Sequence, residues 1–394
     1  MIETERSKTL DYRPKYAACV SILVVALASA MFTISSNASD TVVMKYEKFT
    51  KALETTRSEM DLPGLRAAIR LSDGTVIQGA VGWADVATES HLDNVAPMPG
   101  GSTGKIFVAA LTMLLEEEGT LSLDDLASKW LEDLPWFDRL PNAHDIRVWH
   151  LLSHTSGMSD YPDSRSYQFQ SIWRAIRRGS VQFEPEELIR FTLRKRPLFP
   201  VGQGFGYTDI GFLVLGKLIE AASDRQYYDL LQEKIFIPLS LDQILPQDKS
   251  ILPGVVTGYT RGAPNLREDG RMKFDPSSEW TGGGLAFNPT MLVEFLGALA
   301  ELRVVNSDSF KKMLDMGWRD PDSPGEHYGL GLFVNDEQKT IGHAGLWPGY
   351  RTDVLHYLSS NTTIAVQTNR DGPVDTQELI RRVALFADID LSLD

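Results

Sequence analysis

The sequence predicts a mixed α/β (α+β) fold, in which both chain ends build an antiparallel sheet and a largely helical region is inserted between them. Short β-type runs occur near the start and again near the end of the 394-residue chain, and helical patterns fill the stretch between them. Hydrophobic residues make up 43% and charged residues 23% of the chain, which is ordinary globular composition with ample material for a large core.

The first 38 residues are expected to be a secretory signal peptide or an N-terminal membrane anchor. Four cations precede an uncharged stretch from Tyr16 to Ser39. Its apolar centre spans 18 residues, which fits a cleaved signal and lies at the lower limit for a membrane span. The remainder is expected to be exported to the periplasm or the extracellular space. The only cysteine, Cys19, lies in this segment, so disulfides and cysteine-ligated metals are not expected in the exported part.

The sheet is expected to begin with a hairpin and to end with a series of short strands. Leu65–Leu71 and Thr75–Val81 flank Asp73-Gly74, a strong hairpin signal. Four further β-type runs, joined by polar turns, lie at residues 327–334, 339–345, 351–358 and 362–369.

Helical patterns occupy the middle of the chain and its end. A single domain is expected from 46 to 390, with the helical insert at about 107–245. The predicted helices are Lys105–Glu118, Pro185–Lys195, Gly211–Ser223, Tyr227–Ile235, Thr290–Leu302 and Thr376–Asp388.

The segment "PMPGGSTGKIFVAAL" admits three interpretations. A phosphate-binding loop would need a glycine where Pro99 stands and a hydroxyl where Ile106 stands. A nucleophile elbow of the G-x-S-x-G kind matches around Ser102, but it requires a preceding strand and a parallel sheet. The third interpretation is a Ser-x-x-Lys pair. An apolar, buried helix follows Lys105, so Ser102 and Lys105 would lie on one face of its first turn as an activated nucleophile. A capping serine followed by a solvated lysine would give the same short pattern.

Further motifs favour the Ser-x-x-Lys interpretation. Together with it, in order and with plausible spacing, they resemble the serine β-lactamase and penicillin-binding-protein superfamily, in the branch of class C β-lactamases, D-alanyl-D-alanine carboxypeptidases and related esterases. The resemblance covers about Tyr46 to the C-terminus. The motifs are "IRVWHLLSHTSGM" (146–158), "PVGQGFGYTDIGFLVLGKLIE" (200–220), "WTGGGLAFNPTMLVEF" (280–295) and "IGHAGLWPGYRTDV" (341–354).

The resemblance implies a role for each residue of the site. Ser102 would be the acylated nucleophile and Lys105 its partner. Tyr207 would pass protons, with its pKa lowered by the nearby ammonium. Backbone N–H groups of Ser102 and Leu346 would form the oxyanion hole. Gly345 would leave room for the approaching substrate.

Two departures from the family pattern bear on the substrate. Asp209 stands where the tyrosine motif usually has asparagine; it would either keep Lys105 charged or only cap the following helix. His343 stands where class C β-lactamases carry lysine, and a histidine is only partly charged near pH 7. Arg351 is a candidate replacement cation for a substrate carboxylate. Both departures favour a carboxypeptidase, D-amino-acid peptidase or esterase over a β-lactamase.

Other functions remain as alternatives or are disfavoured. A β-lactamase, a non-catalytic sensor of peptidoglycan fragments or β-lactams, and an elbow-type esterase with His343 as base are the alternatives. A net charge of −14 argues against nucleic acid as a partner. His150 and His154 have ligand-like spacing without a third ligand, so neither a metal nor another cofactor is expected. The expected partner is a small-molecule or peptide substrate, with membrane contact only through the N-terminal segment.

Overall fold

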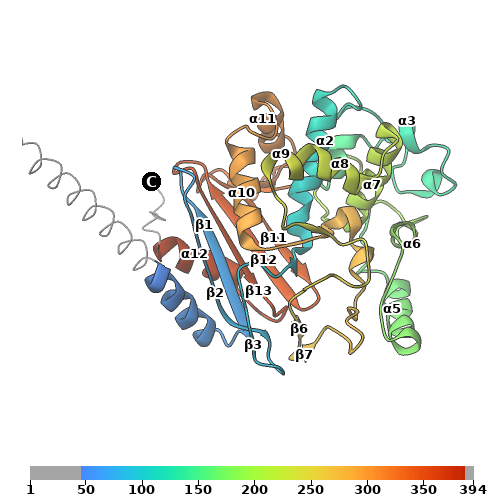
Figure 1. Cartoon of the computed structure of the whole chain (residues 1–394). Coiled ribbons are helices and arrows are strands. Elements are labelled where there is room, and N and C mark those ends of the chain that lie inside the picture. The colour runs from blue at the N-terminus through green and yellow to red at the C-terminus, as the bar shows by residue number, and fades with distance from the viewer. Residues whose placement is uncertain (1–45, 387–394) are drawn as a thin grey trace, which may run out of the picture. The chain divides into compact units, whose positions relative to one another are not determined.

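One eight-stranded sheet, in which every neighbouring pair is antiparallel, contains strands from both halves of the chain (Figure 1). The computed structural model describes residues 46–386. The strand order is β3-β2-β1-β13-β12-β11-β10-β9, which confirms the predicted fold class. The strands are β1 (Gly64–Arg70), β2 (Val76–Asp85), β3 (Ser90–His91), β9 (Glu326–Tyr328), β10 (Phe333–Asn335), β11 (Thr340–Trp347), β12 (Tyr350–Tyr357) and β13 (Thr362–Thr368).

The join between the two chain ends lies inside this sheet, between its third and fourth strands. Strand β1 pairs with β13, and Arg66 of β1 is fully buried beside Gln367 of β13. Its guanidinium donates two hydrogen bonds to the Gln367 side-chain oxygen, at 3.1 and 2.8 Å, and others to backbone carbonyls. A buried guanidinium needs such partners, so this contact fixes the join.

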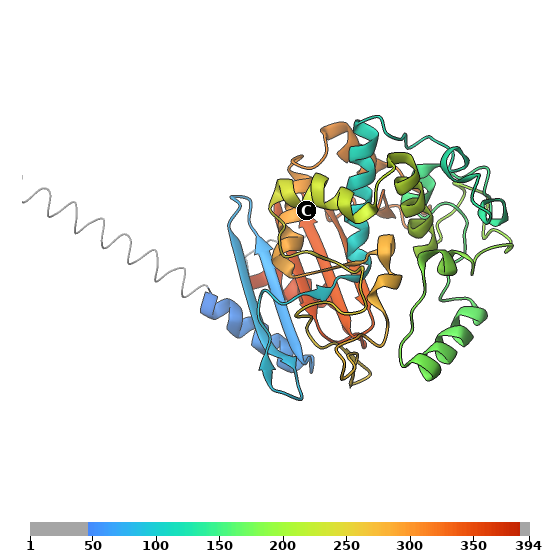
Figure 2. The ribbon, with the colours of Figure 1, turned by 45° about the vertical axis from the view of Figure 1, so that its right-hand side comes forward.

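Helices cover both faces of the sheet (Figures 1 and 2). On one face, a helix that includes residues 49–59 packs with α12 (Thr376–Phe386), where the rings of Phe49 and Phe386 lie 5.0 Å apart. On the other face, α10 (Pro289–Ala300) lies against β1 and β13, and α2 (Lys105–Glu117) belongs to the same apolar core.

The helical region and several short elements complete the fold. The remaining helices are α3 (Ser128–Leu131), α4 (Val148–Leu152), α5 (Arg165–Arg178), α6 (Pro185–Ile189), α7 (Asp209–Ser223), α8 (Tyr227–Leu231), α9 (Ile237–Leu239) and α11 (Ser307–Asp315). A π-helical turn, Gln232–Phe236, joins α8 to α9. One small sheet contains β4 (Met98–Pro99), β8 (Leu285–Phe287) and β5 (Leu245–Pro246); another contains β6 (Tyr259–Thr260) and β7 (Ala263–Pro264).

Two predicted elements differ from the observed ones. The helix predicted for Pro185–Lys195 ends as α6 at Ile189, and the chain then turns until the N–H of Arg194 donates to the Arg139 carbonyl at 2.7 Å. The strand predicted for 327–334 is split into β9 and β10, because Gly331 adopts a φ of +78° between them.

The predicted signal or anchor, residues 1–38, lies outside the described residues. Within residues 46–386, no helix is both long enough and apolar enough to cross a membrane.

Candidate active site

Ser102 lies in a short 3-10 turn, Gly101–Gly104, that leads directly into helix α2. The turn follows β4, and the N–H of Gly100 donates to the Leu285 carbonyl at 2.9 Å. Close backbone packing holds the turn: a Cβ at Gly104 would lie 2.2 Å from the Gly283 carbonyl oxygen. Since β4 belongs to a small antiparallel sheet, the parallel sheet that a nucleophile elbow requires does not surround Ser102.

Lys105 is completely buried and directs its ammonium at three acceptors. Its Nζ lies 3.1 Å from Ser102 Oγ, 2.6 Å from Asp209 Oδ1 and 2.5 Å from the Gly282 carbonyl oxygen. An ammonium carries three protons, so each acceptor takes one. In this geometry Lys105 donates to Ser102, and it must lose a proton before it can accept one.

Tyr207 is half-buried beside Lys105, with its hydroxyl oxygen shielded from solvent, and Lys105 Nζ lies 5.1 Å from the centre of the tyrosine ring. Burial raises the pKa of Tyr207 well above its ordinary value, the Asp209 carboxylate raises it further, and an interaction with Ser102 opposes both. The prediction of a lowered pKa was therefore wrong, because removal from water outweighs the neighbouring ammonium. Among the described residues the Tyr207 hydroxyl has no hydrogen-bond partner of regular geometry, so its interaction with Ser102 is a looser contact. Tyr207 is a neutral phenol facing the nucleophile.

His154 holds Tyr207 in place. The His154 carbonyl accepts the N–H of Gly206 at 2.9 Å, and His154 Nδ1 accepts the N–H of Thr208 at 3.2 Å. His154 therefore forms hydrogen bonds with the residues on both sides of Tyr207. The two rings lie 4.1 Å apart. Burial lowers the pKa of His154 well below its ordinary value, so the imidazole is neutral. The sequence analysis considered His154 only as a possible metal ligand and missed this positioning role.

Asp209 is a partner of Lys105 rather than the cap of its helix. It is the first residue of α7, whose N-cap position is Thr208. The N–H of Ile210 is accepted by the carboxylate of Asp160 at 3.3 Å, which leaves the Asp209 carboxylate for Lys105. Tyr161 donates a longer hydrogen bond, 3.4 Å, to its second oxygen.

Strand β11 runs past the nucleophile turn along an open edge. Among the described strands, β10 pairs with β11 only at Thr340–Gly342, so Leu346 and its neighbours lie beyond that pairing. A Cβ at Gly345 would lie 2.0 Å from the Gly100 carbonyl oxygen. The close approach of the strand to the turn therefore requires the glycine by itself, a reason that the sequence analysis did not identify. The backbone of Leu346 lies close to Gly101, and both Leu346 and Ser102 line the adjacent cavity. This placement suits two oxyanion donors.

His343 and Arg351, two predicted substrate contacts, are not among the described residues that line the cavity. His343 is buried, with Nδ1 2.6 Å from the Ala344 carbonyl and Nε2 2.9 Å from the Tyr328 hydroxyl. Burial and the Lys105 ammonium lower the pKa of His343 to about 3, so it is neutral near pH 7, and the partly charged imidazole expected from the sequence was wrong. Arg351, on β12, donates to the Asp371 carbonyl at 3.4 Å and is not among the described residues that line the cavity.

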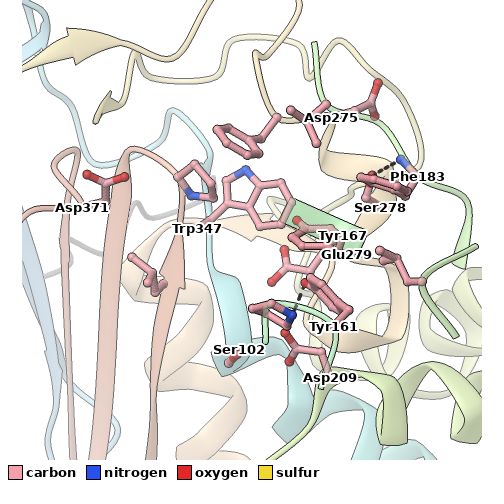
Figure 3. A pocket seen from close by; sticks show the side chains of 16 residues that line it. Ser102, Tyr161, Tyr167, Phe183, Asp209, Asp275, Ser278, Glu279, Trp347 and Asp371 are labelled. Atoms are coloured by element: carbon pink, nitrogen blue, oxygen red, sulfur yellow. Dashed lines mark hydrogen bonds between the residues drawn. The ribbon is translucent and has the colours of Figure 1, made fainter. Parts of the chain in front are cut away.

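A cavity of about 300 Å³ opens from Ser102 (Figure 3). Aromatic side chains form much of its wall: Tyr161, Tyr167, Phe183, Phe274 and Trp347. Among the described residues that line it there are four acids and no Lys, Arg or His: Asp209, Asp275, Glu279 and Asp371. Figure 3 shows Ser102 and Asp209 at one end of the cavity and Asp275 towards the other. The cavity therefore suits a substrate with an apolar group and a positive charge, and it opposes a carboxylate.

Glu279 is the acid that the sequence interpretation overlooked, although it directly precedes the glycine-rich motif. Gln247 donates to its Oε2 at 2.5 Å. Burial raises the pKa of Glu279 to about 8, partly offset by Lys105. This carboxyl is thus mainly protonated at neutral pH.

A metal site is not evident in the described part of the chain. Between residues 46 and 386, no three His, Cys, Asp or Glu side chains form a group that could hold an ion. His150 instead accepts the N–H of Arg147 at 2.9 Å.

Comparison with known proteins places this site in a family. The family model described as Beta-lactamase matches residues 49–388. The chain belongs to the Beta-lactamase family. It is accordingly a serine hydrolase of the β-lactamase and penicillin-binding-protein type.

Related proteins of known name share low sequence identity with this chain, but the alignments cover most of it. Penicillin-binding protein 4* of Bacillus subtilis is 24% identical over 327 residues, covering 77% of this chain and 67% of that protein. A D-aminopeptidase of Brucella anthropi is 24% identical over 316 residues, covering 79% of this chain and 56% of the enzyme. The chain thus spans little more than half the length of that D-aminopeptidase.

Solved structures show the same fold. A D-stereospecific amidohydrolase from Streptomyces sp. aligns with a TM-score of 0.72 at 24% identity, covering 85% of this chain and 97% of that one. The D-amino acid amidase from Ochrobactrum anthropi SV3 aligns with a TM-score of 0.71 at 21% identity, covering 88% and 99%.

Proposed function

We propose that the protein is an exported hydrolase that forms an acyl-enzyme at Ser102 and cleaves amides, short peptides or esters of amino acids, with preference for substrates that keep a free ammonium group. The observation that carries the proposal is the position of the Lys105 ammonium, 3.1 Å from Ser102 Oγ. Both lie beside a cavity that is lined, among the described residues, by acids and by no Lys, Arg or His.

The reaction begins when Lys105 has lost one proton. The amine then accepts the Ser102 hydroxyl proton while Ser102 Oγ bonds to the substrate carbonyl carbon. Backbone N–H groups of Ser102 and Leu346 stabilise the oxyanion. The Tyr207 phenol donates its proton to the departing amine or alkoxide as the bond to that group breaks, and it regains a proton from Lys105, which thereby returns to the neutral amine. Water then attacks the ester carbonyl carbon and gives one proton to the Lys105 amine. The bond to Ser102 Oγ breaks, Lys105 returns the proton to that oxygen, and the acid is released.

The charge of the cavity and the names of relatives support a substrate with a free ammonium group. A substrate ammonium would be attracted to Asp209, whereas the carboxylate of a β-lactam or a peptide C-terminus would be repelled by it. Relatives named D-aminopeptidase and D-amino acid amidase agree with such a substrate. Neutral His343 supplies no counter-ion for a carboxylate. A β-lactamase is therefore the less favoured alternative.

A matched pair of substrates tests the preference for an ammonium. D-alanine p-nitroanilide and its N-acetyl derivative differ at the amine alone. We expect kcat/KM to be at least about 10-fold higher for the free amine, the size of one modest charge contact. Equal values, or faster hydrolysis of the acetylated compound, would reject the ammonium preference while leaving the acyl-enzyme intact.

A fluorescent acylating probe tests the acyl-enzyme itself. Wild type should be labelled and Ser102→Ala should not be; equal labelling would favour the non-catalytic sensor. Lys105→Ala should lose nearly all p-nitrophenyl ester hydrolysis, whereas an esterase with His343 as base would keep most of it.

Export is proposed on the sequence of the first 38 residues. Intact-mass measurement of the protein recovered from the medium, periplasm and membrane of the producing cell separates a cleaved signal from an anchor. Recovery of the uncleaved chain in the cytoplasm alone would reject export.

A further inference from the structure

Helix α5 turns its apolar side chains outward. Phe169, Ile172, Trp173 and Ile176 are 70%, 61%, 45% and 80% exposed. Their spacing places them along one stripe of the helix. No residue of α5 is buried against the described part of the chain. Exposed apolar stripes of this kind usually mark an interaction site.

The opposite face of α5 is fixed to the domain by polar and aromatic contacts. Arg174 forms two hydrogen bonds with the Glu187 carboxylate, at 3.2 and 2.8 Å, and lies 3.9 Å from the Phe183 ring centre. Tyr167 packs on Phe183 with ring centres 5.2 Å apart and lines the cavity that opens from Ser102. The outward direction of the apolar stripe follows from these contacts, and both ribbon views place α5 at the periphery (Figures 1 and 2).

The charge of α5 contrasts with that of the whole chain. Residues 165–178 contain four arginines and no acid, whereas the protein has a net charge of −14. Arg165, Arg177 and Arg178 are exposed, and the guanidinium of Arg177 lies 4.7 Å from the Trp173 ring centre. Arginine beside tryptophan and other apolar side chains is the composition of helices that lie in the interface of a bilayer.

We propose that α5 docks on the surface of a membrane that contains anionic lipids. The apolar stripe would enter the boundary between headgroups and acyl chains, and the exposed arginines would contact lipid phosphates. A second copy of the chain fits less well, because symmetric pairing through α5 would bring two arginine clusters together. Since Tyr167 belongs to α5, docking would hold the cavity near the bilayer surface.

A local probe tests the contact independently of any membrane binding by the N-terminal segment. In a Cys19→Ala background, Ile176→Cys or Ile237→Cys is labelled with the environment-sensitive dye NBD. Ile237, on α9, is 65% exposed and serves as the matched control. The full chain is mixed with phosphatidylcholine vesicles that contain or lack phosphatidylglycerol. A soluble p-nitrophenyl ester checks that each variant is folded.

We expect the emission of the dye at 176 to rise and shift to shorter wavelength with anionic vesicles, and the dye at 237 to stay unchanged. Two exposed arginines contribute a preference for anionic over neutral vesicles on the order of 10-fold or more. Arg177→Glu with Arg178→Glu should abolish that preference. Equal responses at 176 and 237, or a preference that survives the double substitution, would overturn the proposal. A shift at 176 that needs only higher protein concentration would indicate self-association and overturn it as well.

Discussion

Replacing Asp209 with asparagine should remove most of the electrostatic attraction that holds the Lys105 ammonium beside a carboxylate. The two charges lie 2.6 Å apart, Lys105 is fully buried, and the Asp209 side chain is 25% exposed. Their attraction is about 1.6 kcal/mol at the dielectric constant of water and about 6 kcal/mol at an effective constant of 20. Partial exposure of Asp209 favours the lower figure as a minimum estimate. The asparagine oxygen can still accept the hydrogen bond, so the attraction is the main loss.

Ester hydrolysis measured from about pH 6 to about pH 9 reports this change. Since a factor of ten in rate corresponds to about 1.4 kcal/mol, removing the attraction should raise kcat/KM for a neutral p-nitrophenyl ester about 10-fold or more near pH 7. Nitrocefin, which carries a carboxylate, should gain more than the ester because a repelling charge is also removed.

Asp371→Asn is the matched control, because it removes another cavity acid that is not an ion-pair partner of Lys105. Its Oδ2 accepts the N–H of Gly349 at 2.9 Å, a role that an asparagine oxygen can keep. We expect its ester profile to match wild type. Superimposable profiles for Asp209→Asn and wild type would refute the reasoning. A loss of activity in folded Asp209→Asn would instead mean that the carboxylate is needed as a proton acceptor.

Three further substitutions give expected outcomes. Tyr207→Phe should lower kcat by about 10²–10⁴-fold with little change in melting temperature, because the hydroxyl has no regular hydrogen bond among the described residues; unchanged kcat would remove its role as proton donor. Gly345→Ala places a methyl 2.0 Å from the Gly100 carbonyl oxygen and should cost about 1–3 kcal/mol in urea unfolding, and wild-type stability would contradict the packing argument. The native pKa of Glu279, about 8, exceeds its ordinary 4.5, so the folded state binds a proton that the unfolded state has released, and stability falls as pH rises from 4.5 through 8. Glu279→Gln should therefore lose less stability than wild type between pH 6 and pH 9 in urea unfolding, and equal losses would show that Glu279 is not the titrating group.

The sheet was predictable because its signals are local. Asp73-Gly74 separates two alternating runs; β1 forms within a residue of its predicted bounds, and β2 begins within a residue of its predicted start but continues four residues further, to Asp85. The C-terminal strands are likewise separated by polar turns. Their common sheet was expected because β-type runs occur at both ends of the chain, with helical patterns between them. By contrast, the sequence analysis did not predict α5, although its apolar residues have helical spacing. None of its residues is buried, and its apolar stripe faces outward, so this helix does not belong to the core that the other helical patterns describe.

The parts of the site formed by residues close together in the sequence were predictable. The parts that depend on charged side chains from distant segments were less so. Ser102 and Lys105 are three residues apart, so a helical turn brings them together. The charge state around them depends on burial, which a sequence does not reveal. For that reason the pKa of Tyr207 was predicted in the wrong direction, and neutral His343 was taken for a partly charged group. Glu279 reaches the cavity through tertiary packing and has no motif of its own.

The pairing of β1 with β13 also has a consequence for biosynthesis. Arg66 meets its partner 301 residues later in the chain. At about 5–20 residues per second, a ribosome needs roughly 15–60 s to deliver that partner. Throughout this interval the first hairpin presents a bare edge to other nascent chains, so premature termination near the end of the message would leave a product that cannot close its central sheet.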